Sequence, residues 1–375
     1  MRYLKGTYKP TKTLTAGKII GRILLSVFTA VVLLIIALYL SLYVVLNGEC
    51  EPLRERLVLS ATQASATKWL PSLFIPQEEV DGIVAKSLEV TTDTLSLEEY
   101  LASQVTEETA EAEDKWSKAI DGMLYEKVTG PTFTGYVLLI RDPSRVYVGV
   151  STDNFASSVA GIRIFDMAKK DDAIAVVNAG EFEDQGGQGT GARPMGLTYS
   201  NGKCVWDDGL KRTFIGFDSD NRLVVTEPMT KETADKLSIR DAVSFQNGNT
   251  LITSSDGEVV FHYSDWNTGT AQRTAIGQCA DGTVIFLVTD GRTASSLGAT
   301  KNDVIDIMVK YGAVTAGMLD GGSSSLMYYE DYYTKYGIDT ENLDKYQQMG
   351  LVNSYKAFTN PRRLPTFFCI SREAE

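Results

Sequence analysis

The sequence predicts a sheet-rich domain of the mixed α/β or α+β class, preceded by a transmembrane helix and a helical stalk. A charge-free apolar run occupies residues 23–46, a stretch rich in Glu, Ala and Lys follows up to about residue 128, and short β-branched or aromatic runs separated by glycine fill the rest. With 375 residues, 43% of them hydrophobic and 22% charged, the chain has the composition of a globular protein.

Residues 23–46 are predicted to cross a membrane, because an uncharged helix of that length spans the roughly 30 Å of a bilayer's hydrocarbon core. The alternative, a cleaved signal peptide, would have a shorter apolar core and a small-x-small cleavage site. Only basic charges precede the run, at Arg2, Lys5, Lys9, Lys12, Lys18 and Arg22, and acidic ones follow it, at Glu49, Glu51 and Glu55. The positive-inside rule therefore predicts a single-pass protein of the cell membrane with a cytoplasmic tail, residues 1–22, and everything after Asn47 outside.

Residues 47–128 are predicted to form an extracytoplasmic helical stalk. The string SLEEYLASQVTEETAEAEDKWSKAIDGMLYEK, residues 96–127, has few glycines and many residues of high helix propensity. We interpret its acidic residues as a solvated helix face.

Residues 129–375 are predicted to form the main domain. Its strand-like runs are GYVLLIRD, RVYVGVST, AIAVVNAG, NRLVVTEP, GEVVFHYS, TVIFLVTD, AVTAGMLD and LPTFFCI. A helix is indicated after TVIFLVTD, since Thr300 and Asp303 form a capping pattern and Gly312 ends the apolar stripe. The strand–helix–strand order predicts at least one right-handed βαβ unit with parallel strands.

Charge and composition exclude several classes of function. A net charge of −12 argues against a nucleic-acid partner, which would need clustered Lys and Arg. Four cysteines without a CxxC pair and a single histidine make a zinc site of nitrogen and sulfur ligands improbable. His262 lies in a strand-like run, and we interpret it as structural rather than catalytic.

Two aspartates follow the strands of the predicted βαβ unit. Asp290 in DGR and Asp320 in DGGSSS would both lie at the carboxyl ends of parallel strands, the edge where open α/β sheets bind ligands. The competing interpretation is that each Asp-Gly begins a tight turn.

A glycine-rich segment, residues 178–196, follows the strand-like run AIAVV. Its glycines allow backbone N–H groups to approach an anion, which Arg193 could bind in bidentate fashion. The segment lacks the GK[ST] of a nucleotide-binding P-loop, and an ordinary surface loop is the alternative.

A predicted hairpin within residues 271–292 would bring Arg273 and Arg292 to one rim, because the turn ADG separates its strands. Two guanidinium groups beside two aspartates suggest an anionic substrate. The alternative is a set of surface Arg–Asp pairs, which contribute little to stability.

The strings NAGEF, RPMG, RTAIG, VTDGR and LDGGSSSLM, in this order, resemble the phosphodiester glycosidase family over residues 129–370. Members commonly have Asn-Gly-Gly-Phe-Phe where this chain has Ala179 and Glu181 at the second and fourth positions. They also usually have a third glycine where this chain has Ser323.

This resemblance implies a hydrolase that releases a sugar from a sugar-1-phosphodiester in a cell-surface glycan or sugar-phosphate polymer, such as one of a bacterial surface. A carboxylate would act at the anomeric carbon, while cations and N–H donors would stabilise the departing phosphate. The candidate catalytic residues are Asp320, Asp290 and Glu181. The candidate substrate-binding residues are Asn178, Gly180, Arg193, Arg273, Thr274, Gly291, Arg292, Gly321, Gly322, Ser323 and Ser324.

No cofactor is required, although a Ca²⁺ or Mg²⁺ ion held by Asp290, Asp320 and backbone carbonyls remains open. A different class of function is a non-catalytic glycan-binding protein in exopolysaccharide assembly or anchoring, which would agree with the changes at Ala179 and Glu181. A third is cleavage on the phosphorus side, which usually relies on two metal ions.

Overall fold

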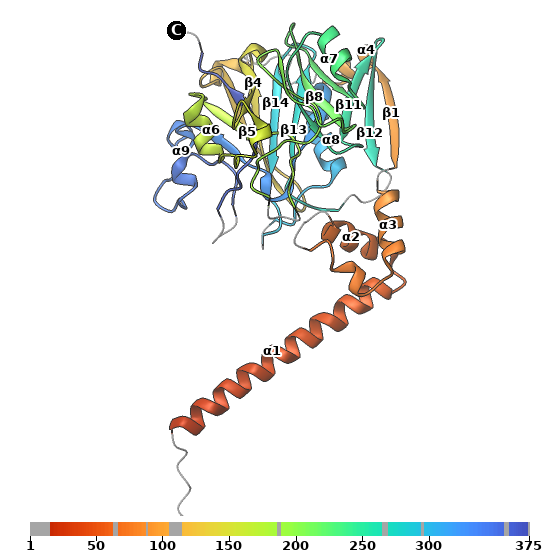
Figure 1. The fold of residues 1–375 in the computed structure, drawn as a ribbon, viewed down its shortest axis with the longest axis vertical. Coiled ribbons are helices and arrows are strands. Elements are labelled where there is room, and N and C mark those ends of the chain that lie inside the picture. The colour runs from red at the N-terminus through yellow and green to blue at the C-terminus, as the bar shows by residue number, and fades with distance from the viewer. Residues whose placement is uncertain are drawn as a thin grey trace, which may run out of the picture. The chain divides into compact units, whose positions relative to one another are not determined.

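The computed structural model describes residues 16–62, 67–87, 89–104, 115–185, 189–264, 269–293, 296–355 and 360–373. The chain divides into two compact units, and the second, Glu55–Glu375, holds every strand described (Figure 1).

The first unit is dominated by α1, Ala16–Asn47. Its stretch Gly17–Asn47 is long and apolar enough to cross a membrane, and its large hydrophobic side chains are mostly exposed. The helix predicted over residues 23–46 is therefore present and begins earlier, and by length and composition it fits a transmembrane span or a signal anchor.

The largest sheet is antiparallel at every described pairing and has eight strands (Figure 1). In spatial order they are β1 Val90–Ser96, β12 Glu258–Ser264, β11 Thr250–Ser255, β15 Ala313–Leu319, β13 Thr274–Cys279, β14 Val284–Thr289, β3 Thr134–Ile140 and β2 Met123–Thr129.

Two smaller antiparallel sheets pack with it. The five-stranded sheet has the order β7 Lys203–Trp206, β6 Thr198–Ser200, β10 Ile239–Phe245, β8 Thr213–Asp218 and β9 Leu223–Thr226. The four-stranded sheet has the order β16 Met327–Tyr329, β5 Ala175–Asn178, β17 Thr366–Ile370 and β4 Val146–Val150.

The three sheets share one hydrophobic core. Phe368 of β17 lies with its ring centroid 6.2 Å from that of Phe217 in β8 and 6.3 Å from that of Phe286 in β14. Such aromatic pairs contribute about 0.5–1.5 kcal/mol each beyond the area that they bury. The ring of Phe368 thus joins strands from all three sheets.

Short helices cover the sheets: α6 packs on β5, β16 and β17, α8 on β11, β12 and β15, and α7 on β10. The helices after α1 are α2 Glu51–Thr62, α3 Gln77–Lys86, α4 Leu97–Gln104, α6 Ile164–Lys170, α7 Lys231–Lys236, α8 Lys301–Lys310 and α9 Tyr332–Lys335. The predicted capping of α8 is confirmed, since the side chains of Thr300 and Asp303 each accept a hydrogen bond from the other's backbone N–H.

The predicted parallel βαβ unit is wrong. β14 and β15, the strands before and after α8, do not pair with each other, because β13 lies between them and pairs antiparallel with both. The crossover rule concerns parallel strands that are joined by a helix. Here β13 and β14 form an antiparallel hairpin, and β13 takes the place beside β15 that the prediction gave to β14.

The predicted stalk is not wholly helical. α4 falls within the expected helical stretch, but β1 and β2 lie at the two ends of the eight-stranded sheet, paired with β12 and β3. Residues 105–114 of the predicted stalk lie outside the described residues. The β-branched sequence of β1, VTTDTLS, favours a strand once a partner strand is available.

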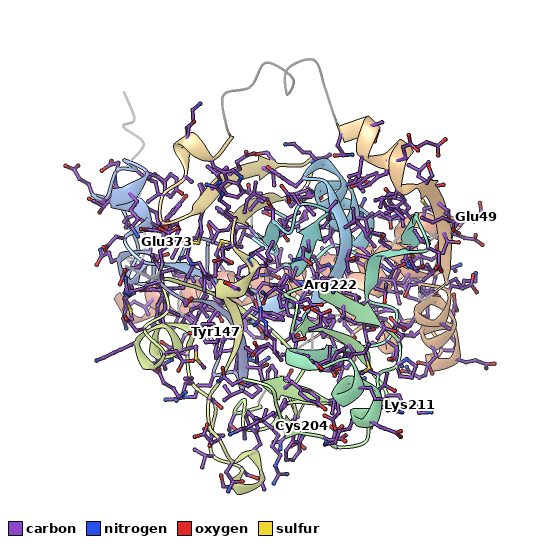
Figure 2. All side chains as sticks on the ribbon, turned by 90° about the horizontal axis from the view of Figure 1, so that it is seen from above. Glu49, Tyr147, Cys204, Lys211, Arg222 and Glu373 are labelled. Atoms are coloured by element: carbon purple, nitrogen blue, oxygen red, sulfur yellow. The ribbon has the colours of Figure 1, made fainter. Side chains whose placement is uncertain are left out.

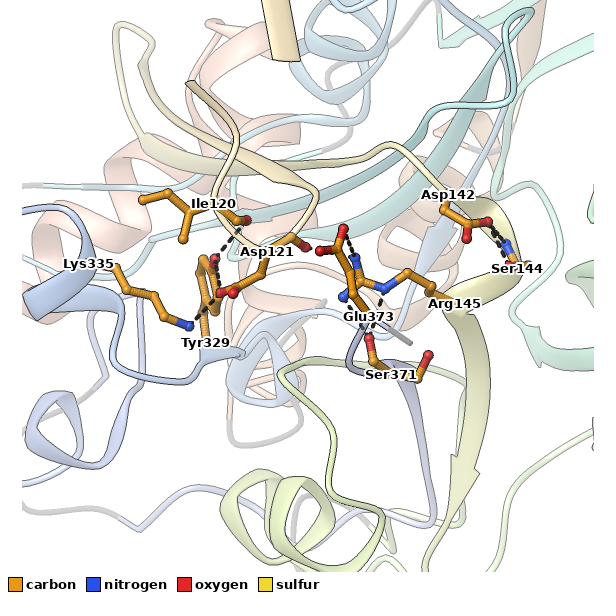
Figure 3. Close-up of polar contacts among 9 residues, drawn as sticks. All are labelled: Ile120, Asp121, Asp142, Ser144, Arg145, Tyr329, Lys335, Ser371 and Glu373. Carbon is orange, nitrogen blue, oxygen red and sulfur yellow. Dashed lines mark hydrogen bonds and ion pairs between the residues drawn. The ribbon is translucent and has the colours of Figure 1, made fainter. Parts of the chain in front are cut away.

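Polar contacts bind one end of the sheets, where β2 begins and β17 ends (Figure 3). Arg145 donates from Nε and Nη2 to the carbonyl of Ser371 at 2.9 and 2.7 Å, and from Nη1 to the carbonyl of Asp121 at 2.7 Å. The Asp121 carboxylate in turn accepts from Lys335 at 2.6 Å and from Tyr329 at 3.2 Å. These side chains bind one another or nearby backbone carbonyls. The candidate site lies at the opposite end of the sheets.

Candidate functional site

The carboxyl ends of β14 and β15 lie at one edge of the eight-stranded sheet, with the start of β13 between them. Thr274 pairs with Val288 on one side and with Leu319 on the other. Asp290 and Asp320 follow β14 and β15 directly, so they flank the start of β13. The two aspartates share an edge as expected, although through an antiparallel arrangement.

Asn178, at the end of β5, joins the four-stranded sheet to this edge. Its Nδ2 donates to the carbonyl of Asp320 at 2.6 Å, and its Oδ1 accepts from Thr274 Oγ1 at 2.8 Å and from the N–H of Leu326 at 3.0 Å. The N–H of Asp320 also donates to the carbonyl of Ala179 at 2.9 Å. Asn178 and Thr274, both predicted to bind substrate, therefore at least hold the Asp320 loop in place.

Asp320 is the most strongly perturbed carboxyl group of this edge. Burial raises its pKa to about 7, and the nearby carboxylates of Glu181 and Asp184 act in the same direction, whereas a hydrogen bond with Ser324 and the charge of Arg362 lower it. A carboxyl group with such a pKa exchanges a proton near neutral pH, as a general acid or base requires.

Glu181 is close enough to influence Asp320 and is itself perturbed. Burial raises the pKa of Glu181, while Arg212 and Gln246 lower it. Its Oε2 lies 3.4 Å from Arg212 Nε without a hydrogen bond to any described residue, and its Oε1 accepts from Gln246 at 3.3 Å. In Figure 2, Lys211, the exposed neighbour of Arg212, lies at the periphery with Cys204.

The backbone around Glu181 is packed closely against β10. The N–H of Glu181 donates to the carbonyl of Ser244 at 2.8 Å. A Cβ atom at Gly180 would lie 2.9 Å from Val243 Cβ and 3.0 Å from the Ser244 carbonyl oxygen, so a side chain at residue 180 would displace this strand. Contacts with the five-stranded sheet thus fix the backbone position of Glu181.

Asp290 has a different environment. Its Oδ2 accepts from the hydroxyl of Tyr136 at 2.7 Å, and its Oδ1 accepts from the N–H of Ser354 at 2.9 Å. Burial raises its pKa, and these hydrogen bonds lower it. With both oxygens engaged, Asp290 connects β14 to β3 and to the loop at Ser354.

The two predicted arginines lie at this edge but donate to backbone carbonyls. Arg273 is buried and donates to the carbonyls of Ala299 at 3.0 Å and Gly269 at 3.1 Å, and burial lowers its pKa to about 10. Arg292, in the left-handed backbone region at φ 56°, donates to the carbonyl of Ser60 in α2 at 3.2 Å. Through these described contacts, the two guanidinium groups stabilise neighbouring loops rather than being presented to a substrate.

The predicted glycines allow the two Asp-Gly loops to approach residue 272. The N–H of Gly322 donates to the carbonyl of Gln272 at 2.9 Å. A Cβ atom at Gly321 would lie 3.0 Å from that oxygen, and one at Gly291 would lie 2.8 Å from the Gln272 nitrogen. Both loops therefore close on the residue that precedes Arg273.

Ser323 and Ser324 are brought to the site, whereas Arg193 is not among these contacts. The carbonyl of Ser323 accepts from the Tyr355 hydroxyl at 3.3 Å, and Ser324 is buried beside Asp320. The Arg193 guanidinium donates instead to the carbonyls of Phe155 and Ala156, each at 3.4 Å.

Among the residues that the structure describes, no three His, Cys, Asp or Glu side chains gather in a way that could hold a metal ion. The described hydrogen bonds place Asp290 and Asp320 in separate clusters, with Tyr136 and Ser354 in one and Asn178 and Ser324 in the other.

The family profile of the phosphodiester glycosidases matches residues 171–371, more than half of the chain. The chain belongs to the phosphodiester glycosidase family. The matched residues include the loops of Glu181, Asp290 and Asp320.

Two known proteins are similar to this member of the phosphodiester glycosidase family. The catalytic domain of zebrafish N-acetylglucosamine-1-phosphodiester alpha-N-acetylglucosaminidase, auto-inhibited by its pro-peptide, aligns with a TM-score of 0.51 and 17% identity over 76% of this chain and 89% of that one. The SPbeta prophage-derived uncharacterized protein YomE of Bacillus subtilis strain 168 is 24% identical over 253 residues, which are 63% of this chain and 33% of YomE. The matched region thus spans about a third of the length of that relative.

Two arginines at this candidate site were not predicted from the sequence. Arg362 forms an ion pair with Asp184, lies 4.9 Å from the ring centroid of Phe182 and acts on the pKa of Asp320, and Arg212 faces Glu181. The adjacent cations Arg362 and Arg363, just before the predicted strand LPTFFCI, were the available signal. Their relation to Asp320 depends on the pairing of β17 with β5, which sequence spacing does not reveal.

Proposed function

We propose that this protein is a hydrolase that cleaves the glycosidic C–O bond of a sugar-1-phosphodiester. The observation that carries the proposal is the placement of Asp320: a buried carboxyl group with a pKa of about 7, beside Glu181 and the Arg362 cation, in loops that match the phosphodiester glycosidase profile. Paired carboxyl groups with perturbed pKa values are typical of glycoside hydrolysis.

In this proposal Asp320 holds the proton and Glu181 is the ionised partner. The pKa of Glu181 is raised, but Arg212 and Gln246 favour its charged form. Glu181 would therefore face the anomeric carbon, as base or nucleophile, while Asp320 exchanges a proton with the departing oxygen.

Arg362 would stabilise the phosphate that leaves. A phosphate is a weak base and needs less help from a proton donor than an alcohol does, so a nearby cation and backbone N–H groups matter more. Arg362 fits this role better than Arg273 or Arg292, because its charge already acts on Asp320.

The proposed substrate is a cell-surface glycan or sugar-phosphate polymer. We propose that α1 anchors the chain in the cell membrane with the tail inside and the glycosidase domain outside, which the basic residues before α1 and the acidic ones after it support.

A glycan-binding protein in exopolysaccharide assembly or anchoring is the second candidate. The pairing of Glu181 with Arg212 favours it, because a carboxylate held by a cation can act as a structural element rather than as a catalyst.

The test is to incubate the protein with a panel of sugar-1-phosphodiesters and to follow released reducing sugar. Hydrolysis is expected for the wild type, with a fall of roughly a hundredfold or more in Asp320→Asn and in Glu181→Gln. Binding without release would favour the glycan-binding protein. Full activity in both variants would contradict the assignment of these carboxyl groups.

A further inference from the structure

Gln272, two residues before β13 begins, has a buried acceptor without a partner among the described residues. The residue is 8% exposed, and its Oε1 accepts no hydrogen bond from any residue that the structure describes. A buried amide oxygen without a hydrogen-bond donor destabilises the folded protein. Beside the candidate site, a donor group of a bound ligand would supply the missing hydrogen bond.

The backbone fixes Gln272 between the two Asp-Gly loops. Its carbonyl accepts from Gly322 at 2.9 Å, and the same oxygen would lie 3.0 Å from a Cβ atom at Gly321. On its other side, its nitrogen would lie 2.8 Å from a Cβ atom at Gly291. The residue is therefore positioned by the loops that carry Asp290 and Asp320.

The direction of the side chain follows from strand alternation. Residues two apart in an extended segment share a face. Thr274 directs its hydroxyl to Asn178, which in turn binds the carbonyl of Asp320. Gln272 is two residues before Thr274, so continued extension of the chain would place its side chain on the face of Asn178, whereas Arg273 between them donates to the carbonyls of Ala299 and Gly269.

We propose that Gln272 is a substrate-binding residue whose side-chain carbonyl accepts a hydrogen bond from a hydroxyl or amide N–H group of the sugar. The inference rests on the proposed function, because it assigns the sugar to the edge where Asp320 lies. It also makes Gln272 a determinant of specificity: a sugar with the matching donor gains this hydrogen bond, and a sugar without it binds less tightly.

The strand that follows Gln272 supplies a matched control. Gln278 in β13 is 7% exposed, almost the same as Gln272, but its side chain is fully paired. Its Oε1 accepts from Leu223 at 2.7 Å, and its Nε2 donates to the carbonyls of Asn221 at 2.9 Å and Gly282 at 3.1 Å. Gln278 lies toward the opposite edge of the sheet, away from Asp320.

The experiment compares Gln272→Met and Gln278→Met, which remove the amide while nearly keeping its length. Thermal unfolding of the full chain needs no substrate: Gln272→Met is expected to keep or raise the Tm, and Gln278→Met to lower it. A fall in Tm for Gln272→Met equal to that of Gln278→Met would overturn the inference, whatever the activity.

The second readout uses sugar-1-phosphodiesters and their single-deoxy analogues. With the wild type, one deoxy analogue should have a kcat/KM about tenfold below that of the parent compound. With Gln272→Met, the kcat/KM of the parent compound should fall to that of this analogue. The kcat/KM of the analogue itself should not change, as a double-mutant cycle requires. Hydrolysis by Gln272→Met with the wild-type preference among analogues would overturn the inference and leave the proposed function standing.

If the wild type hydrolyses none of these compounds, the proposed function fails, and calorimetric binding of α-glucose 1-phosphate and its deoxy analogues tests Gln272 separately. Weaker binding to Gln272→Met than to Gln278→Met would support the inference. Equal binding to both variants, or no binding to the wild type, would overturn it.

Discussion

At the scale of single residues, the candidate site is defined by carboxyl groups that differ in their surroundings. Asp290 has both oxygens engaged by Tyr136 and Ser354, whereas the charge of Glu181 helps to raise the pKa of Asp320. The same side-chain type thus has both oxygens engaged by neighbouring donors in one case and a pKa raised to about 7 in the other.

The pKa of Asp320 predicts how stability depends on pH. Its folded value of about 7 lies above the ordinary value of about 3.9 in an unfolded chain. Between these values the folded protein holds a proton that the unfolded chain has lost, so this group's contribution to the free energy of unfolding falls as pH rises through the window. Asp320→Asn cannot titrate, so urea unfolding should show the variant gaining stability over the wild type as pH rises. A difference that stays constant with pH would contradict the assignment.

Removing the charge of Arg362 should change the pKa of Asp320. Because this cation lowers the pKa of Asp320, Arg362→Gln should move the corresponding limb of the pH–rate profile to higher pH and reduce kcat by about a hundredfold. The control is Arg363→Gln, since the guanidinium of Arg363 donates to the carbonyl of Gly161 at 3.1 Å and is expected to leave the limb in place. Equal shifts in both variants would show that Arg362 has no particular role.

At the scale of elements, much of the main domain could be predicted from its sequence. The eight β-branched or aromatic runs form β3, β4, β5, β9, β12, β14, β15 and β17, because each has enough apolar residues to fill a sheet face. Partner choice could not be predicted: β13 lies between β14 and β15, and no local pattern records that arrangement.

The candidate site could likewise be predicted only in part from the sequence. The Asp-Gly loops were visible as breaks after buried strands, and the edge they share follows from strand direction. The use of each arginine was not visible, because only the fold shows that Arg273 and Arg292 donate to the carbonyls of Ala299, Gly269 and Ser60.

The contact of α2 with the site edge gives a prediction about an element. Gly269 has φ 71°, and a Cβ atom there would lie 2.9 Å from the nitrogen of Ser60, the residue whose carbonyl accepts from Arg292. Gly269→Ala should therefore cost roughly 2–3 kcal/mol of unfolding free energy, through both the strained backbone and the clash. Gly202 has φ 70° with nothing within 4 Å, so Gly202→Ala measures the backbone effect alone, at about 1 kcal/mol. Equal losses in urea unfolding would show that α2 does not press on this loop.

At the scale of the whole molecule, an apolar helix precedes, in the sequence, a domain of the phosphodiester glycosidase family. The length of α1 exceeds the roughly 20 residues needed to cross a bilayer. Anchoring would keep the domain close to polymers of the cell surface.

Cys50, exposed just after α1, reports the predicted topology. A membrane-impermeant maleimide added to intact cells should label it, and Cys50→Ser should remove most of the labelling. A cysteine placed in the tail, for example Thr13→Cys in the Cys50→Ser background, should react only after the cells are opened. Labelling of the tail in intact cells would reverse the proposed orientation.

The central claim is that the bond between the sugar and the phosphate is broken on the sugar side, at a site built around Asp320. The most direct measurement is hydrolysis of a sugar-1-phosphodiester in heavy-oxygen water, followed by mass spectrometry of both products, for the wild type and Asp320→Asn. We predict heavy oxygen in the released sugar, with its rate of appearance greatly reduced in the variant. Heavy oxygen in the phosphate, or undiminished release by Asp320→Asn, would contradict the account.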